Sequence, residues 1–336
     1  MPPKRRRVSK SPPTKGCGDK GSATLSRASG LRQHDKLWFD DGSIIIATDV
    51  HLYRVHRGML SRYSKVLSDI FEMPTAGETS DLWEDVPIVG MVGDSDVEVY
   101  LLLKGLYDRN FRDTLREYAM PAISSLLSIS SKYDFQEIRA DVLQFLTSLF
   151  PRTLKEYEAS KIHNRELHPG EIFELLVVAH RCEALSILPP LYYLCSRFPL
   201  ETSIDHIQSL PKDYAKQLFL GRDWLCEVSQ HLFKQSLQSA RVGGSFAPIC
   251  KYPHCLEKFR AQLAEKYPNA QPERRFMFVF DLPEHGILED LDMQRCGICE
   301  PCETKYLEML NEIKRFAWNR LPVKFLNMTW EDLRRK

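Results

Sequence analysis

The 336-residue sequence contains no long apolar run. Although 43% of its residues are hydrophobic, no segment approaches the roughly 18 consecutive apolar residues of a membrane-spanning helix. The first residues also lack the apolar core of a secretory signal. We therefore expect neither a membrane-spanning nor a secreted protein. In that setting the nine cysteines are expected to be reduced thiols or metal ligands, and the glycosylation motif at Asn327 to be silent.

Familiar catalytic motifs are missing as well. The sequence has no phosphate-binding P-loop, no HExxH metalloprotease helix, no GxSxG nucleophile turn and no recognisable pair of catalytic carboxylates. A GxGxxG match at Gly16–Gly21 follows no expected strand and opens no expected helix, so we discard it. Repeats with the period of kelch or ankyrin units are also lacking. We expect a protein that is not an enzyme.

The net charge of +1 conceals an asymmetry between the N-terminal segment and the rest. Residues 1–36 hold ten basic and two acidic residues and are rich in Pro, Ser, Gly and Thr. Such a segment buries too little apolar surface to offset the entropy of ordering, so residues 1–31 are predicted to be a disordered basic tail. Its cluster of cations between prolines is typical of a nuclear import signal, and predicts a nuclear or otherwise cytoplasmic protein. The alternatives are a solubilising tail or a nonspecific nucleic-acid contact. The cluster consists of Lys4, Arg5, Arg6 and Arg7.

Residues 32–151 are predicted to form an α+β unit. Strand-like runs at 38–39 and 43–47 flank an Asp-Asp-Gly turn and predict a hairpin, and residues 51–56 alternate as a third strand. Two short helices are expected over 57–63 and 64–71, then a polar loop from Pro74 to Glu84. A strand at 86–89 precedes a helix that Asp94 or Ser95 can cap. Apolar positions at helical spacing predict this helix and two more; they are Val99, Leu102, Leu103 and Leu106, then Ile123, Leu126 and Leu127, then Ile138, Val142, Phe145, Leu146 and Leu149.

Five residues of this unit occur in the order and spacing of a sequence motif that is known from one protein family. An acidic residue lies near the first strand, and an apolar-His-basic step leads from a strand into a helix. A leucine, a serine and an aromatic pair then follow in the next two helices. This pattern resembles the opening of a BTB/POZ domain, in which these positions have structural roles such as capping and strand-to-helix bonding. The residues are Asp35, His56, Leu60, Ser64 and Phe71.

The resemblance implies a fold and a way of acting. It implies a short mixed sheet with a group of helices, and a protein-interaction platform that is commonly a homodimer. In one branch of the family the domain attaches substrates to a cullin-type ubiquitin-ligase scaffold. Members that bind a cullin tend to carry a large apolar residue two positions before a glutamate after the second helix. The nearest match here is Ala76 and Glu78, which we take as candidate partner-binding residues.

Residues 152–240 are predicted to form a helical extension. A stripe from Ile172 to Ala179 predicts one helix, Pro189-Pro190 separates it from the next, and Pro211 suits the start of another. A helical block in this position loosely resembles the BACK-type extensions of BTB adaptors. The segments Leu188–Pro199 and Gly221–Leu225 resemble more closely a large fungal set of BTB-containing proteins.

Residues 241–336 are predicted to form a Cys-containing, mostly helical C-terminal region. Five of the nine cysteines lie between residues 250 and 302, and short Cys-x2-Cys turns supply pairs of ligands to tetrahedral zinc. We predict a structural zinc site with four cysteine ligands, in which Cys296 or His254 can take the place of one of the four. The alternative is a set of ordinary reduced thiols, three of them on one face of a helix that begins near Cys296. The predicted ligands are Cys250, Cys255, Cys299 and Cys302.

Three functions remain open on these observations. The first is a non-catalytic interaction protein that binds protein partners, or a second copy of itself, through the BTB unit. The second is a substrate adaptor of a cullin-type ligase. The third is a nuclear regulator that binds chromatin or DNA through its basic tail, which predicts nucleic-acid binding with a steep salt dependence.

Overall fold

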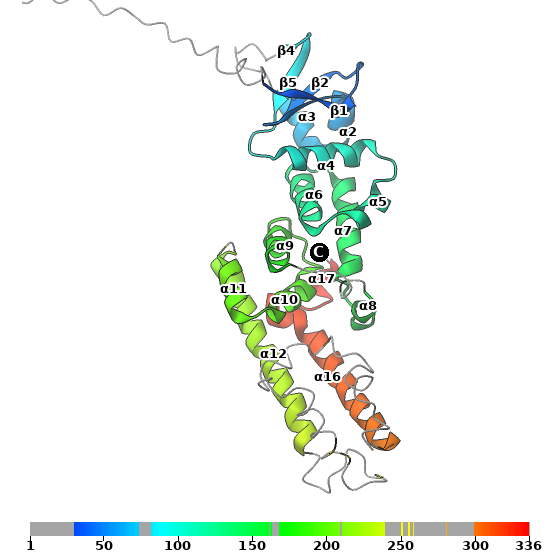
Figure 1. Cartoon of the computed structure of the whole chain (residues 1–336), viewed down its shortest axis with the longest axis vertical. Helices are drawn as coiled ribbons and strands as arrows, with labels where there is room; N and C mark the ends of the chain where they lie inside the picture. Colours follow the sequence, from blue (N-terminus) through cyan, green and yellow to red (C-terminus); the bar gives the residue numbers. More distant parts are fainter. Residues whose placement is uncertain are drawn as a thin grey trace, which may run out of the picture. The chain divides into compact units, whose positions relative to one another are not determined.

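The computed structural model describes residues 30–73, 82–160, 162, 168–208, 210–238, 250, 255, 258, 280 and 299–335 (Figure 1). It has the expected mixed α+β composition, with a small five-stranded sheet and a majority of helical residues. Two compact units are present, one of Met1–Arg62 with Leu67–Tyr100 and one of Tyr63–Val66 with Leu101–Lys336. The import cluster Lys4–Arg7, the loop residues Ala76 and Glu78, and the substitute ligands His254 and Cys296 lie outside the described residues. The predicted boundaries at 151 and 240 stay predictions.

The sheet of the first unit has the strand order β1-β3-β2-β5-β4. β1 pairs in parallel with β3, and β2 in parallel with β5, whereas β2–β3 and β4–β5 are antiparallel. Ile45 of β2, Leu52 of β3 and Val86 of β5 form its buried centre, which Trp38 and Trp83 cover. The strands are β1 (Arg32–Trp38), β2 (Ile44–Ala47), β3 (His51–Val55), β4 (Leu82–Trp83) and β5 (Val86–Gly90).

The hairpin predicted between residues 38–39 and 43–47 is wrong, because β3 lies between β1 and β2. The turn itself forms, since the Gly42 N–H donates to the Phe39 carbonyl over 2.9 Å. Its two ends then bond to β3: Phe39 N–H donates to Arg54, and Ser43 N–H to Val55. A Cβ at Gly42 would lie 2.8 Å from the Arg54 side chain, so the close approach of β3 requires glycine there.

The predicted polar loop from Pro74 to Glu84 ends in a strand. Leu82 and Trp83 form β4 and pair with Pro87 and Val86 of β5. The two residues between the strands, Glu84 and Asp85, have φ values of 47° and 66°. Positive φ at both central residues is the conformation of a two-residue type I′ turn, whose twist suits a hairpin. The sequence lacks the Asn-Gly or Asp-Gly signal that such turns usually carry, which is why this strand was missed.

The helices expected next to the sheet are present. They are α2 (Arg57–Tyr63), α3 (Lys65–Glu72) and α4 (Asp96–Tyr107). Ser95 caps α4 through a capping box, because its hydroxyl accepts from the Glu98 N–H and its own N–H donates to the Glu98 carboxylate. Asp96 then accepts hydrogen bonds from the hydroxyls of Thr48 and Tyr53. These bonds attach the start of α4 to the β2–β3 hairpin.

The second unit is helical among its described residues. The predicted apolar stripes of α6, α7 and α9 are buried, with Ile123, Val142 and Leu176 fully inaccessible. α6 packs on α7 and α9, and α9 on α10 and α11. No helix in the described part of the chain combines the length and apolar character needed to cross a membrane. The elements are α5 (Phe111–Thr114), η1 (Leu115–Glu117), α6 (Met120–Lys132), α7 (Gln136–Leu149), α8 (Leu154–Glu158), α9 (Pro169–Arg181), α10 (Leu188–Arg197), α11 (Leu200–Ile207), α12 (Lys212–Gln238), α16 (Glu300–Leu326) and α17 (Asp332–Arg335).

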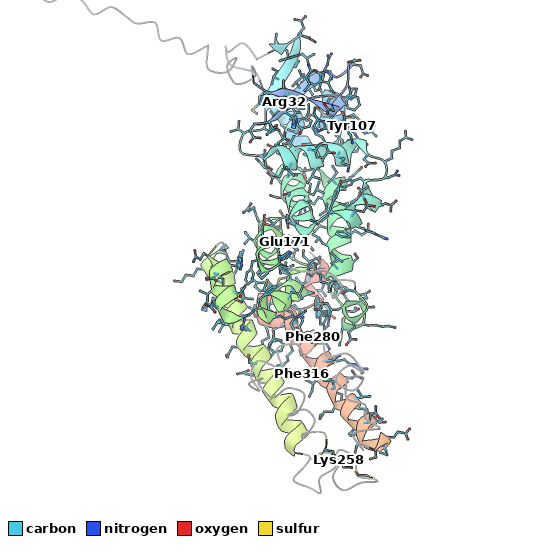
Figure 2. All side chains as sticks on the ribbon, in the orientation of Figure 1. Arg32, Tyr107, Glu171, Lys258, Phe280 and Phe316 are labelled. Carbon is cyan, nitrogen blue, oxygen red and sulfur yellow. The ribbon has the colours of Figure 1, made fainter. Side chains whose placement is uncertain are left out.

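Two long helices, α12 and α16, lie side by side and run in opposite directions (Figure 1). At their contact the Phe325 ring stacks on Tyr192 of α10 at 5.1 Å and faces Gly221 of α12. Phe280, labelled in Figure 2, packs edge-on against Tyr193 of α10 and Trp318 of α16. Aromatic rings of α10 and α16 therefore pack together at two places in the core of this unit.

α16 also carries a buried cation. The Lys314 side chain is only 1% exposed, and its Nζ lies 3.0 Å from Glu158 of α8. A buried ammonium costs several kcal/mol unless it is paired, so this ion pair fixes α8 on α16. Next to it, the Trp318 indole N–H donates to the Arg152 carbonyl over 2.8 Å.

Replacing Gly221 by alanine is expected to destabilise the protein, although alanine favours a helix by about 1 kcal/mol over glycine. A Cβ at Gly221 would lie 2.0 Å from the Phe325 ring, which is fully buried and cannot withdraw. We expect Gly221→Ala to lower the free energy of unfolding in urea by about 1–3 kcal/mol. The double variant Gly221→Ala/Phe325→Leu should recover part of that loss. Unchanged or increased stability of Gly221→Ala would contradict the close contact.

His180 is expected to make the stability of the helical unit depend on pH. Its Nε2 lies 2.7 Å from the Tyr192 hydroxyl, and its ring stacks on Tyr214 at 3.7 Å. Burial lowers the pKa of His180 from 6.5 to about 4. The unfolded chain therefore binds more protons between these values, and the stability that is full above pH 6.5 falls as the pH drops toward 4.

Urea unfolding of the full chain at several pH values between 7 and 4 tests this expectation. His180→Gln keeps a polar partner for Tyr192 but removes the titrating ring, so it should reduce the loss of stability over that interval. His168→Gln, at an exposed position before α9, is the matched control. Equal pH dependence of the wild type and His180→Gln would contradict the prediction.

Candidate metal centre

Two of the predicted ligands lie at the N-terminus of α16. Cys299 is the N-cap residue, with φ −82° and ψ 150°, and Pro301 and Cys302 follow in the first turn. Proline suits this place because the first N–H groups of a helix have no partner within it. The Cys302 N–H donates to the Cys299 carbonyl over 2.9 Å, which closes a turn between the two thiols. α16 begins at Glu300, and the alternative of three thiols on one helix face involves Cys296, which lies outside the described residues.

The structure brings all four predicted thiols together. The Cys250 sulfur lies 3.5 Å from that of Cys255, 3.7 Å from that of Cys299 and 3.4 Å from that of Cys302. The Cys255 and Cys299 sulfurs are 3.7 Å apart, and all four lie within 4.8 Å of one another. A metal ion bound to four sulfurs at about 2.3 Å would hold them about 3.8 Å apart. The four thiols therefore have the size and convergence of a tetrahedral metal site.

Three of these four cysteines are buried. Cys255 and Cys302 are fully buried, Cys299 is 4% exposed and Cys250 is half-buried. Burial raises the pKa of the Cys255 thiol, and the Cys299 N–H, which donates to this sulfur, opposes the rise. Metal ions bind the thiolate form, so a bound cation would supply the positive charge that stabilises it here.

The chemistry of the donor set is that of a structural site. Four sulfurs complete a tetrahedron and leave no position for water or substrate, whereas catalytic sites keep one position open. No other group of three or more His, Cys, Asp or Glu side chains within the described ranges converges in this way. The remaining described cysteines, Cys182, Cys195 and Cys226, form no disulfide and are not part of the cluster. The residues present therefore fit a soft divalent metal ion.

The five residues of the BTB-like pattern lie in β1, in α2 and α3, and at the two starts of these helices. Leu60 is buried in α2, and the buried Ser64 hydroxyl donates to the Tyr133 carbonyl at the end of α6. His56 precedes α2, and its Nε2 lies 3.2 Å from Asp41. Phe71 lies in the last turn of α3, where the Arg57 guanidinium lies over its ring and donates to its carbonyl. Asp35 lies exposed within β1 and so caps no helix.

One polar cluster was not predicted from the sequence. The Asp96 carboxylate lies 2.9 Å from His51 Nδ1, in addition to its bonds with Thr48 and Tyr53. His34 of β1 stacks on Tyr53 with the ring centres 4.9 Å apart. The hydrogen bonds lower the pKa of Asp96 against the opposing effect of burial, the largest single influence on this carboxyl. The cluster joins β1, the β2–β3 hairpin and α4.

Comparison with family models, curated proteins and solved structures gives no match. The assignment of a family therefore depends on the residues and the fold described above.

Removing the thiols or the metal is expected to weaken the helical unit. The purified full chain should contain about one equivalent of a thiophilic metal, and Cys299→Ser or Cys302→Ser should lose it. Because metal binding free energy contributes to folding, chelation should lower the melting temperature by about 10 °C. Cys226→Ser, which removes a thiol outside the cluster, should keep both metal and stability. A metal-free wild-type chain whose stability does not change on adding metal would contradict the assignment.

Proposed function

We propose that this chain is a non-catalytic protein-interaction protein of the BTB type, whose helical unit is stabilised by structural zinc. The observation that carries the proposal is the order and pairing of the elements in residues 44–149. An antiparallel hairpin leads into two short helices, a strand returns parallel to the first strand of the hairpin, and helices follow. This is the mixed sheet with a group of helices that the resemblance implies.

Contacts of the motif residues support the same proposal. Ser64 lies at the junction of α2 and α3 and bonds to the turn between α6 and α7, through Tyr133 and a bridge to Phe135. The Arg57–Phe71 pair links the start of α2 to the end of α3. These contacts give the motif residues structural roles, as the resemblance implies.

Zinc is the metal that fits the thiol cluster best. Tetrahedral four-sulfur sites hold zinc or iron, and zinc brings no redox chemistry to a buried structural site. The pair Cys255 and Cys299 is separated by 44 positions in the sequence. A metal that joins them closes this loop and reduces the entropy of the unfolded chain, as a disulfide would. We propose that zinc fixes the N-terminus of α16 to the segment around Cys250 and Cys255.

The basic cluster Lys4–Arg7 supports a nuclear location for this activity, because a short run of cations fits an acidic import receptor. Partners of the proposed platform are proteins, a second copy of the chain or a cullin scaffold. Candidate contact residues in the described part of the first unit are Val92 and Val97 beside the start of α4, which are 81% and 60% exposed. Covering such exposed aliphatic side chains with a partner removes apolar surface from water, which favours binding.

Light scattering on the full chain, alone and mixed with the N-terminal region of a cullin, tests the proposal. We expect either twice the 39.0 kDa mass of one chain or a stable complex with the cullin. The double variant Val92→Asp/Val97→Asp should weaken the association by roughly tenfold or more, because a charge buried at an interface is costly. Val323→Asp, at a 40% exposed position of α16, is the matched control.

A monomer that does not bind the cullin would contradict both modes of association that the resemblance implies. The proposed nuclear location is tested separately: a fluorescently tagged chain with Arg5→Ala and Arg6→Ala should be excluded from the nucleus. Unchanged nuclear accumulation of that variant would contradict the import signal. Binding of the full chain to duplex DNA with a steep salt dependence would favour the chromatin function instead.

A further inference from the structure

A pocket of about 420 Å³ lies in the helical unit, and none of the four clustered cysteines lines it. Residues 152–154, 315–319 and 330–334 contribute to its walls. The Trp318 indole N–H donates to the Arg152 carbonyl, and the Trp330 indole N–H donates to the Trp318 carbonyl over 2.9 Å. The two indole rings stack at 5.8 Å with 17° between their planes. These contacts fix the three segments relative to one another.

The C-terminal wall is held by local hydrogen bonds. Asn327 adopts the left-handed conformation with φ 54° and ends α16, so the chain turns back at this residue. Thr329 and Asp332 then bond to each other's backbone N–H in the manner of a helix cap. This turn holds Trp330 and α17 beside the last turns of α16. The backbone and the two indole rings around the pocket are therefore held in place by the fold.

The pocket carries an excess of positive charge. Three of its lining residues are Arg152, Arg315 and Arg334, and a guanidinium stays protonated at any physiological pH. Glu331 is the one acidic residue in the lining. Within the described residues none of the three arginines forms an ion pair. Three cations and one anion leave the pocket two positive charges in excess.

One of these arginines has an unmet hydrogen-bonding group. The Nε of Arg152 is buried and has no hydrogen-bond partner among the described residues. A buried donor without an acceptor costs about 1–3 kcal/mol, and the residue that carries it lines the pocket. Arginine binds carboxylate and phosphate oxygens in pairs, which suits an oxyanion ligand.

We propose that this pocket binds a phosphate monoester. A phosphate monoester carries close to two negative charges at neutral pH and matches the excess charge of the pocket, whereas a carboxylate carries one. The Trp330 ring and Leu154 provide apolar surface for the organic group that bears the phosphate. The volume lies in the range of small-ligand pockets. A free phosphorylated small molecule and a phosphorylated side chain share this chemistry.

Titration of the full chain with phenyl phosphate, followed by tryptophan fluorescence and calorimetry, tests the proposal. We expect saturable binding that weakens about tenfold in Arg315→Gln and in Arg334→Gln, because each removes a charged hydrogen bond. Glu331→Gln removes the opposing charge and should tighten binding about threefold. Benzoate, which has the same ring and a single charge, should bind at least tenfold more weakly.

Arg320→Gln is the matched control. Arg320 lies exposed on the same helix, stacks on Phe316 at 4.8 Å and is not part of the pocket lining. Binding that Arg320→Gln weakens as much as Arg315→Gln would overturn the proposal, as would no saturable binding up to about 10 mM. The altered arginines are exposed, and circular dichroism of each variant checks that the fold is kept.

Two further ligands distinguish the sources of the phosphate. A short peptide with one phosphotyrosine that binds at least tenfold more tightly than phenyl phosphate assigns the pocket to phosphorylated protein partners. Equal affinity of the two assigns it to small phosphorylated molecules. Equal binding of the phosphorylated and unphosphorylated peptide would overturn the proposal. These outcomes do not depend on the BTB unit, so they can be separated from those of the light-scattering experiment.

Discussion

The helical unit depends on the insertion of α16 among helices that come much earlier in the sequence. Lys314, which is 1% exposed, must find Glu158 of α8, since a buried ammonium without its carboxylate would cost several kcal/mol. One turn further, Trp318 bonds to the Arg152 carbonyl, and at the end of the helix Phe325 packs on Tyr192 and Gly221. These contacts leave α16 one orientation and one axial position.

Because α16 is fixed in this way, it can position residues of two candidate sites. Its N-terminus presents Cys299 and Cys302 to Cys250 and Cys255, and its C-terminal half supplies Arg315 to the arginine-lined pocket. A rigid helix positions side chains more exactly than a loop does, which a metal site with sulfurs about 3.8 Å apart requires. The same element that closes the core thus organises both candidate sites of this unit.

Periodicity was a reliable guide where one helix face is buried, as for α4, α6, α7 and α9. The thiol ligands were also predictable, because cysteine is rare and its short spacing at Cys299 and Cys302 restricts the geometry. Turn chemistry located the bend at Gly42 but could not tell which strand pairs beside it, because pairing depends on long-range contacts. Glu84 and Asp85 show the converse, a tight hairpin turn with positive φ at both residues that lacks the glycine such turns usually contain.

The arginine-lined pocket could not have been found in the sequence. Arg152 and Arg334 are common surface residues, and only the folding of α16 onto α8 brings them together. No local pattern encodes that contact, since the hydrogen bond that secures it joins positions 166 apart. Similarly, the Asp96 cluster joins the first residue of α4 to three residues of the β2–β3 hairpin, and each of them has an ordinary local role.

The long separation between α16 and its partners has a consequence for synthesis on the ribosome. The β2–β3 hairpin and the α6–α7 pair join neighbouring segments and can form soon after they emerge. The faces of α10 and α12 that receive Phe325 must wait until α16 has been translated, at about 5–20 residues per second. During those seconds Tyr192 and Tyr193, buried in the finished protein, are uncovered on the nascent chain and present an aromatic surface to chaperones.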